Sequence, residues 1–259
     1  MTMDYRIKYS LTVAAAILCC IMASAQGGPQ IFNMSFDSWS KSGGAWYPNP
    51  KGASGARRVW DSANKGLSIL GVNGTQPEYK HLAVEGEGKA AAKITSTKVL
   101  WAFVAGNIYT GEFVRVVDFS GAEMNMGVPF RARPKSISGY YHYIPKKINY
   151  AKPPYENLKG QMDKGRVEVI LTDWEKPYNV VTNNDEFIDG ATDPHVIGRA
   201  ELIIEKGTED YVRFEVPLVY RNSKTPSYAV INAAASRLGA WFTGASGSVL
   251  YLDELQFNY

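Results

Sequence analysis

The stretch GSVLYLDELQFNY, residues 247–259, closes the chain and carries the alternation of a β-strand. With the two-residue period of a strand, Val249, Tyr251 and Leu255 share one face, and Asp253 falls on the same face. An unpaired carboxylate among apolar side chains is costly, so Asp253 needs a partner. The stretch therefore predicts a half-buried strand that holds one charged group beside the core.

The rest of the chain has a similar texture of short apolar or alternating runs separated by Gly, Pro, Asn and Asp. We expect further strands at 99–106, 113–119, 137–144, 166–173, 197–204, 211–220 and 228–235. Since no long helical periodicity and no internal repeat interrupt this pattern, the sequence predicts an all-β fold, a two-sheet jelly-roll β-sandwich. The unusually long connections 40–80 and 175–196 are candidates for function.

Residues 1–25 have the features of a secretory signal peptide: two basic residues, a short apolar run and the small-residue pattern Ala-Ser-Ala before the cleavage point. Both cysteines lie in this segment, so we expect a single domain over 26–259 without disulfides. The apolar run is too short to cross a bilayer. We expect an exported protein, located in the periplasm, at the cell surface or outside the cell.

The charge of the chain is close to balanced, with 28 Lys and Arg against 25 Asp and Glu and a formal net charge of +3. The basic residues are spread along the sequence rather than gathered in one segment. Nucleic-acid binding usually needs a concentrated basic face, so we expect no nucleic-acid partner.

Six stretches, taken in order, resemble one protein family. They are WDSANKG (60–66), GNIYTGEF (106–113), MGVPFRARPKSISGYYHY (126–143), DPHVIGRAEL (193–202), FEVPLVY (214–220) and ASRLGAWFTGASGSVLYLDEL (235–255). Together they are similar to the putative carbohydrate metabolism domain (PCMD) of secreted Bacteroidetes proteins, across nearly the whole chain that follows the signal peptide. The resemblance implies a jelly-roll sandwich like that of carbohydrate-binding modules, in an organism that degrades glycans.

The resemblance also suggests a partner for Asp253. Jelly rolls that bind carbohydrate commonly hold a structural calcium ion between an acidic residue after the first strand and an Asp in the last strand. Here IFNMSFDSW offers Asp37, and two carboxylates with loop carbonyls would satisfy Ca²⁺. The alternative is that Asp253 accepts backbone N–H bonds or pairs with Arg57 or Arg58.

Sugar binding by such folds uses aromatic faces for stacking and polar side chains for the hydroxyls. We expect Trp46, Trp60 and Trp241 to lie in loops and to serve as candidate ligand contacts. Beside Trp60, the segment RRVWDSANKG supplies Asp61 and Asn64. The alternative for this segment is a turn in which both polar residues bond their own backbone.

The segment GNIYTGEF adds Asn107 and Tyr109 as candidate ligand contacts, placed before a glycine turn. For any of the aromatic candidates, the alternative is a structural plug at the end of the sandwich. We identify no catalytic residues. The three histidines lack metal-ligand spacing, and GASGS (244–248) does not have the form of a nucleophile elbow.

The leading hypothesis is an exported, non-catalytic protein that binds a polysaccharide or oligosaccharide during polysaccharide use. An alternative is a glycoside hydrolase or lyase that uses acids of the 175–196 loop, namely Asp185, Glu186, Asp189 or Asp193. Another alternative is a structural or adhesion module of the cell envelope, which would present an exposed apolar patch and no cleft.

Overall fold

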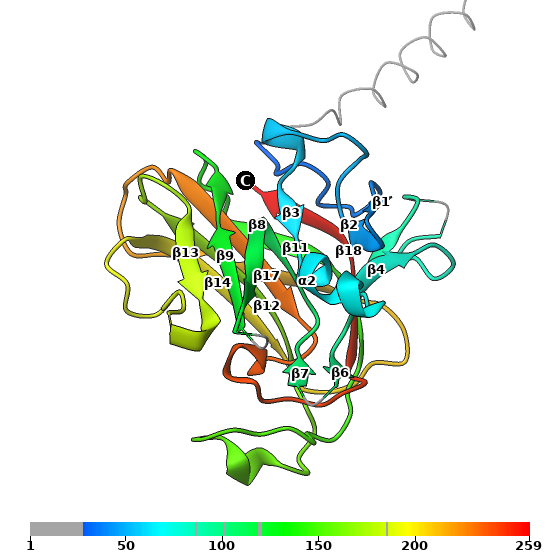
Figure 1. The fold of residues 1–259 in the computed structure, drawn as a ribbon. Helices are drawn as coiled ribbons and strands as arrows, with labels where there is room; N and C mark the ends of the chain where they lie inside the picture. The colour runs from blue at the N-terminus through cyan, green and yellow to red at the C-terminus, as the bar shows by residue number, and fades with distance from the viewer. Residues whose placement is uncertain (1–27, 86, 101, 119–120, 185) are drawn as a thin grey trace, which may run out of the picture.

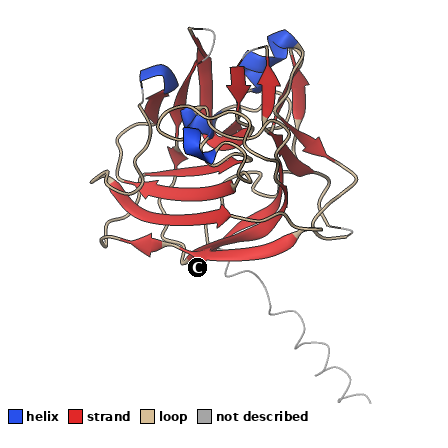
Figure 2. Ribbon diagram, turned by 90° about the horizontal axis from the view of Figure 1, so that it is seen from below, coloured by secondary structure: helices blue, strands red, loops and turns tan. Residues whose placement is uncertain are grey.

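The computed structural model describes residues 28–259 except 86, 101, 119–120 and 185. The predicted signal peptide lies outside the described residues. Within them, almost all regular structure is β-strand, and the short helical turns lie in the connections between strands (Figures 1 and 2). Two large antiparallel sheets account for most of the strands, which confirms the all-β sandwich.

The larger sheet consists of nine strands. They are β3 (Trp60–Asp61), β8 (Asn107–Val117), β9 (Gly121–Met126), β10 (Val128–Pro129), β12 (Gly165–Thr172), β13 (Tyr178–Val181), β14 (Val196–Ile204), β16 (Val219–Tyr220) and β17 (Tyr228–Ala234). Their order is β13-β9-β8-β17-β12-β14-β16, with β3 paired to β8 and β10 paired to β17. The centre of this sheet, β8-β17-β12, forms the base of the site described below.

The smaller sheet has the order β15-β11-β18-β5-β4. Its strands are β4 (Thr75–Glu78), β5 (Ala91–Thr95), β11 (Ser136–Ile144), β15 (Val212–Pro217) and β18 (Val249–Asn258). Two hairpins stand apart, β1 (Ser40–Ser42) with β2 (Ala45–Tyr47) and β6 (Thr97–Val99) with β7 (Ala102–Val104). The helical turns are α2 (Asn64–Leu67), η1 (Gly55–Arg57), η2 (Ser68–Leu70), η3 (Glu156–Leu158), η4 (Thr182–Asn184) and η5 (Gly239–Trp241).

Most of the predicted strands lie where the alternation places them, with two exceptions. The expected strand 211–220 is divided between β15 in the smaller sheet and β16 in the larger one. The expected strand at 99–106 is the other exception. The chain reverses there at Leu100, whose φ is +54°, and forms the β6–β7 hairpin instead of one strand. The connection 40–80 is also richer in structure than expected, because it contains two short hairpin strands, β3, α2 and β4.

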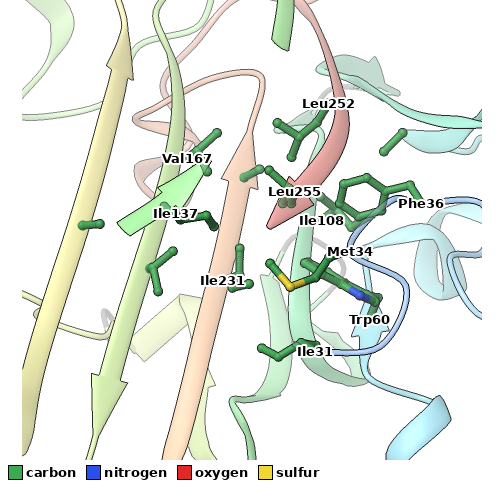
Figure 3. Packing of buried hydrophobic residues seen from close by; sticks show 14 of the residues in the cluster. Ile31, Met34, Phe36, Trp60, Ile108, Ile137, Val167, Ile231, Leu252 and Leu255 are labelled. Atoms are coloured by element: carbon green, nitrogen blue, oxygen red, sulfur yellow. The ribbon is translucent and has the colours of Figure 1, made fainter. Parts of the chain in front are cut away.

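The main core lies between the two large sheets. Val167 and Ile231 enter it from the larger sheet, and Ile137 and Leu252 enter it from the smaller one (Figure 3). Each fully buried aliphatic side chain of this kind contributes about 1.5–3 kcal/mol to folding. The segment around Met34 closes one side of this core.

The last strand departs from the simple alternation that its sequence suggests. Leu250 and Leu252 are buried before residue 253, and Leu255 and Phe257 are buried after it. A β-bulge causes this change of face, since two residues of β18 lie opposite Gly139 alone, and Glu254 has a φ of +48°. The expectation that Leu255 and Tyr251 share a face was therefore wrong.

A second apolar cluster covers part of the outer face of the larger sheet. It includes Tyr109 and Phe113 from β8, Ile170 from β12 and Val230 from β17, and Phe187 of the 175–196 connection packs on it. The connection thus shields one region of the sheet. Among the described residues, no helix has the length and apolar character needed to cross a membrane.

Candidate functional site

A cavity of about 690 Å³ lies on the outer face of the larger sheet, beside the second apolar cluster. Strands β8, β17 and β12 supply its floor. Residues of α2, η2 and the β6–β7 hairpin line it, as do residues of the segment 182–188 and of η5. Its volume is typical of pockets that enclose a small organic ligand.

Strand alternation selects the side chains of the floor. Along β12, Val167 and Val169 enter the main core, so Arg166 and Glu168 point to the opposite face. On β17, Asn232 lies directly across from Glu168. The antiparallel register thereby brings polar side chains from separate strands to one end of the cavity.

Three polar atoms on the cavity floor are buried and have no hydrogen-bond partner among the described residues. They are Oδ1 of Asn107, Oδ1 of Asn232 and Nε of Arg166. A buried polar group without a partner costs about 1–3 kcal/mol, and native proteins contain few of them. A rotation of either amide exchanges its oxygen and its NH₂ group, so both asparagines can present a donor or an acceptor to a ligand.

A network of four charged side chains extends from the polar floor. The carboxylate of Glu168 accepts hydrogen bonds from Nε of Arg199 at 2.8 Å and lies 3.3 Å from Nη1 of Arg166. Glu201 completes the network, with Oε2 at 2.9 Å from Nη2 of Arg199. Because arginines hold both oxygens of Glu168, this carboxylate orients the guanidinium of Arg166 on the floor, while Arg199 lies outside the cavity lining.

Trp241 stands at the rim of the cavity, on η5. Its ring packs against Phe187 at 5.3 Å between centroids and against Tyr155 at 6.0 Å. These contacts hold the ring while leaving it partly exposed. The structure therefore brings together two of the predicted ligand contacts, Asn107 and Trp241, in one cavity.

Trp60 is not a loop aromatic, and this expectation needs correction. The residue belongs to β3, is 1% exposed, and lies in the core next to Phe36, with ring centroids 5.0 Å apart (Figure 3). Its indole N–H donates to the carbonyl of Phe32 at 2.7 Å. Because its faces are covered by protein, it offers no stacking surface to a sugar.

The polar residues that follow Trp60 are buried and serve the backbone, in line with the structural alternative for this segment. Asp61 accepts hydrogen bonds from the N–H groups of Ser62 at 2.8 Å and Phe113 at 2.9 Å. Burial raises the pKa of Asp61 to about 6. Asn64 bonds both the N–H and the carbonyl of Thr75, so it joins α2 to β4.

The remaining ligand candidates do not line the cavity, although Tyr109 lies directly opposite Asn232 in the sheet. Tyr109 is fully buried in the second apolar cluster. Trp46 is half-buried in β2, with Nζ of Lys41 5.3 Å from its ring centroid. The expected glycine turn is absent too, because β8 continues through Gly111, whose backbone lies against that of Asn125 in β9.

The described acids of the 175–196 connection do not line the cavity. Asp189 accepts hydrogen bonds from the N–H groups of Ala191 and Thr192, and Asp193 accepts one from the N–H of His195, so both close turns. Asp185 lies outside the described residues. The connection contributes Thr182, Phe187 and Ile188 to the cavity wall instead.

Sequence reasoning missed Asn232, Arg166 and Glu168. A signal for them was present in the alternation of RVEVILTD (166–173), where charged residues alternate with valines, and in YAVINAAA (228–235), where one Asn interrupts an apolar strand. A polar residue on a strand that is otherwise apolar indicates that this face of the sheet is a candidate binding surface.

The predicted calcium ligands, Asp37 and Asp253, lie near each other on the N-terminal segment and on β18. Asp253 is 3% exposed and accepts hydrogen bonds from the N–H groups of Ala83 at 2.9 Å and Glu254 at 3.0 Å. Asp37 accepts hydrogen bonds from the N–H of Ala90 at 3.2 Å and from the hydroxyl of Ser35 at 3.0 Å. Backbone N–H groups thus serve as partners of Asp253, which was the alternative expectation.

These carboxylates also repel one another. Burial and the neighbouring Asp253 and Asp37 raise the pKa of Glu254 to about 7, and burial raises that of Asp253 to about 6, with a further contribution from Asp37. In the part of the chain that the structure describes, no three His, Cys, Asp or Glu residues are arranged to hold a metal ion. The shared calcium stays a prediction, and the uncompensated negative charge is the observation that supports it.

Comparison with known proteins places the chain among domains related to carbohydrate. The family model described as "Putative carbohydrate metabolism domain" (PCMD) matches residues 35–258. The fold is similar to that of a putative glycoside hydrolase from Bacteroides thetaiotaomicron, with a TM-score of 0.66, 19% identity, and coverage of 90% of this chain and 72% of that chain.

A putative glycoside hydrolase from Bacteroides vulgatus is also similar, with a TM-score of 0.63, 17% identity, and coverage of 90% of this chain and 99% of that chain. At these identities, the two crystal structures show a shared fold. No curated protein matches the sequence.

Proposed function

The chain belongs to the putative carbohydrate metabolism domain family, and from this premise we propose that it is an exported, non-catalytic protein that binds a polysaccharide or oligosaccharide in the cavity on the larger sheet. The observation that carries the proposal is the polar floor, where side-chain atoms of Asn107, Asn232 and Arg166 are buried without a partner among the described residues. Sugar hydroxyls both donate and accept, so a sugar can pair with amides and a guanidinium together.

The rim residue Trp241 supports the same function. Its partly exposed indole ring offers a face for the apolar C–H surface of a pyranose, and its packing against Phe187 and Tyr155 limits the entropy lost on binding. Export is proposed from the signal peptide that the sequence predicts.

Two acidic residues line the cavity among the described residues, Glu168 on the floor and Asp118 just after β8. The contacts of Glu168 favour binding over hydrolysis. Glycosidases use two carboxyl groups that face the scissile bond. On the cavity floor, Glu168 has both oxygens engaged by Arg199 and Arg166, and the neighbouring Glu201 is also held by Arg199. We therefore propose that Glu168 positions Arg166 for hydrogen bonds to the ligand.

The test is affinity electrophoresis of the protein against soluble plant, host and microbial polysaccharides. We expect retardation by at least one polymer, and an affinity at least about tenfold weaker in Trp241→Ala and in Asn232→Ala, since each change removes about 1.5 kcal/mol of contact. Trp241→Phe retains an aromatic face and should retain most of the binding.

Tyr79→Ala and Asn157→Ala are the matched controls, because both residues are exposed and lie outside the cavity lining. Thermal melts of all variants separate a loss of binding from a loss of folding. Equal retardation of the cavity variants and the controls would contradict the proposal. Release of new reducing ends from a polymer would show a glycoside hydrolase or lyase instead.

A further inference from the structure

The cavity changes its chemistry from one end to the other. In the first row across β8, β17 and β12, Asn107 lies opposite Ala234, and Ala234 lies opposite Arg166. In the next row on this face, Asn232 lies between the buried Tyr109 and Glu168. These two rows contain the three floor atoms without partners and the ion pair of Arg166 with Glu168. They form the polar end of the cavity.

Further along β8 the floor becomes apolar. Phe113 pairs with Met124, and Val116 pairs with Ala122, and all four residues line the cavity. The six residue-to-residue steps from Asn107 to Phe113 correspond to about 20 Å of strand, so the two ends are well separated. The rows around Phe113 and Val116 form the apolar end of the cavity.

Most of the wall beside the apolar end is also apolar, with Asp118 and Thr182 as polar exceptions, and much of it faces water. Ile69 and Leu70 of η2 are 83% and 52% exposed, and Val116 is 43% exposed. The helical turn α2 holds this wall against the sheet, because Gly66 leaves so little room that a Cβ there would lie 2.7 Å from Cγ2 of Val116. Exposed aliphatic side chains gathered around a cavity indicate an apolar ligand group.

We infer that the cavity takes an amphipathic saccharide, in which a sugar unit occupies the polar end and an apolar substituent, such as an acyl, alkyl or aryl group, occupies the apolar end. The inference rests on the proposed function and specifies its ligand class. An unsubstituted sugar chain laid along the whole floor would place hydroxyl groups against Phe113, Met124 and Val116, whose side chains offer no hydrogen-bond partner. An apolar substituent meets matching surface there.

The test is isothermal titration calorimetry of the full chain with methyl, butyl and hexyl glycosides of glucose, galactose and mannose, below their micelle concentrations. Burial of a methylene strengthens binding by up to about fourfold, so we expect the hexyl glycoside of the preferred sugar to bind at least about tenfold more tightly than the methyl glycoside. Val116→Ser should reduce this gain at least about threefold.

Val219→Ser is the matched control, because Val219 is a 69% exposed strand valine outside the cavity lining. Equal affinity for methyl and hexyl glycosides overturns the inference, and so does a gain in affinity from methyl to hexyl that is the same in Val116→Ser as in the wild type. In either case the proposed sugar binding stands if Asn232→Ala still weakens the binding of the glycosides. Binding of hexyl chains that is indifferent to the sugar and to Asn232→Ala overturns the proposed function. If none of the nine glycosides binds, the ligand class inferred here is wrong, and the polysaccharide assay alone decides the proposed function.

Discussion

At the scale of single residues, burial decides which polar groups serve the fold and which are available to a ligand. Asn64 and Asn232 are both asparagines in apolar surroundings, but Asn64 has backbone partners for its oxygen and its NH₂ group, whereas Oδ1 of Asn232 has none among the described residues. The same residue type therefore has a structural role in α2 and a candidate binding role in β17.

Replacing Asn64 with Ala should lower the free energy of unfolding by about 2–4 kcal/mol, because the buried N–H and carbonyl of Thr75 would lose their partners. Urea denaturation followed by tryptophan fluorescence measures the change, with Asn157→Ala as a control that should stay within about 0.5 kcal/mol of the wild type. Ligand affinity of the folded Asn64→Ala protein should be unchanged. If Asn64→Ala leaves the stability unaltered and abolishes binding, Asn64 is a ligand contact and its structural role is contradicted.

At the scale of secondary-structure elements, the pairing of β8 with β9 shapes the apolar end of the cavity. Gly111 lies within β8 with a φ of +144°, and a Cβ there would be 2.3 Å from the carbonyl oxygen of Asn125. Glycine permits this close approach of the two backbones. The register then shifts between Phe113 and Arg115, which turns the strand along the cavity floor.

The change Gly111→Ala should destabilise the protein by about 3 kcal/mol or more, since it adds both backbone strain and a collision with β9. Gly160→Ala is the matched control, because Gly160 also has a positive φ but has open space around the position of a Cβ. It should cost only about 1–2 kcal/mol. Thermal and urea unfolding of both variants compare the two effects, and equal losses would show that the approach of β8 to β9 is not tight.

At the scale of the whole molecule, the carboxylates of Asp37, Asp253 and Glu254 join distant parts of the chain. Asp37, in the N-terminal segment, accepts hydrogen bonds from the N–H groups of Lys89 and Ala90, and Asp253, in the last strand, accepts one from the N–H of Ala83. The segment 83–90 is thus held between the two ends of the domain. This arrangement places like charges together, which makes the stability of the whole domain depend on pH.

Glu254→Gln should stabilise the protein, and more strongly as pH rises. Burial and neighbouring carboxylates raise the pKa of Glu254 from 4.5 to about 7, so the folded state binds this proton more tightly than the unfolded state. The stability that protonation provides is complete below pH 4.5 and is lost as pH rises through about 7. Unfolding free energies of both proteins, measured in chelator from pH 4 to 8, should differ little at pH 4 and most at pH 8.

The same comparison tests the proposed calcium ion. Calcium bound between Asp37 and Asp253 would offset the repulsion, so its addition at pH 7 should raise the melting temperature of the wild type and reduce the advantage of Glu254→Gln. A melting temperature that does not change between calcium and chelator would contradict the calcium site. A constant difference between the variants at every pH would contradict the charge repulsion.

The sequence by itself determined the all-β class, the positions of most strands and the family resemblance, because alternation and turn residues act over a few neighbours along the chain. It also indicated Asn107 and Trp241, although not that they share a cavity. Only the tertiary structure decided which residues form the polar floor of the cavity. Strand alternation gives the face on which Arg166 and Asn232 lie, but it does not give which strands are neighbours in the sheet. The buried role of Trp60 and the bulge in β18 were likewise decided by packing across the sandwich. Contacts between strands far apart in the sequence leave no local pattern from which they could be read.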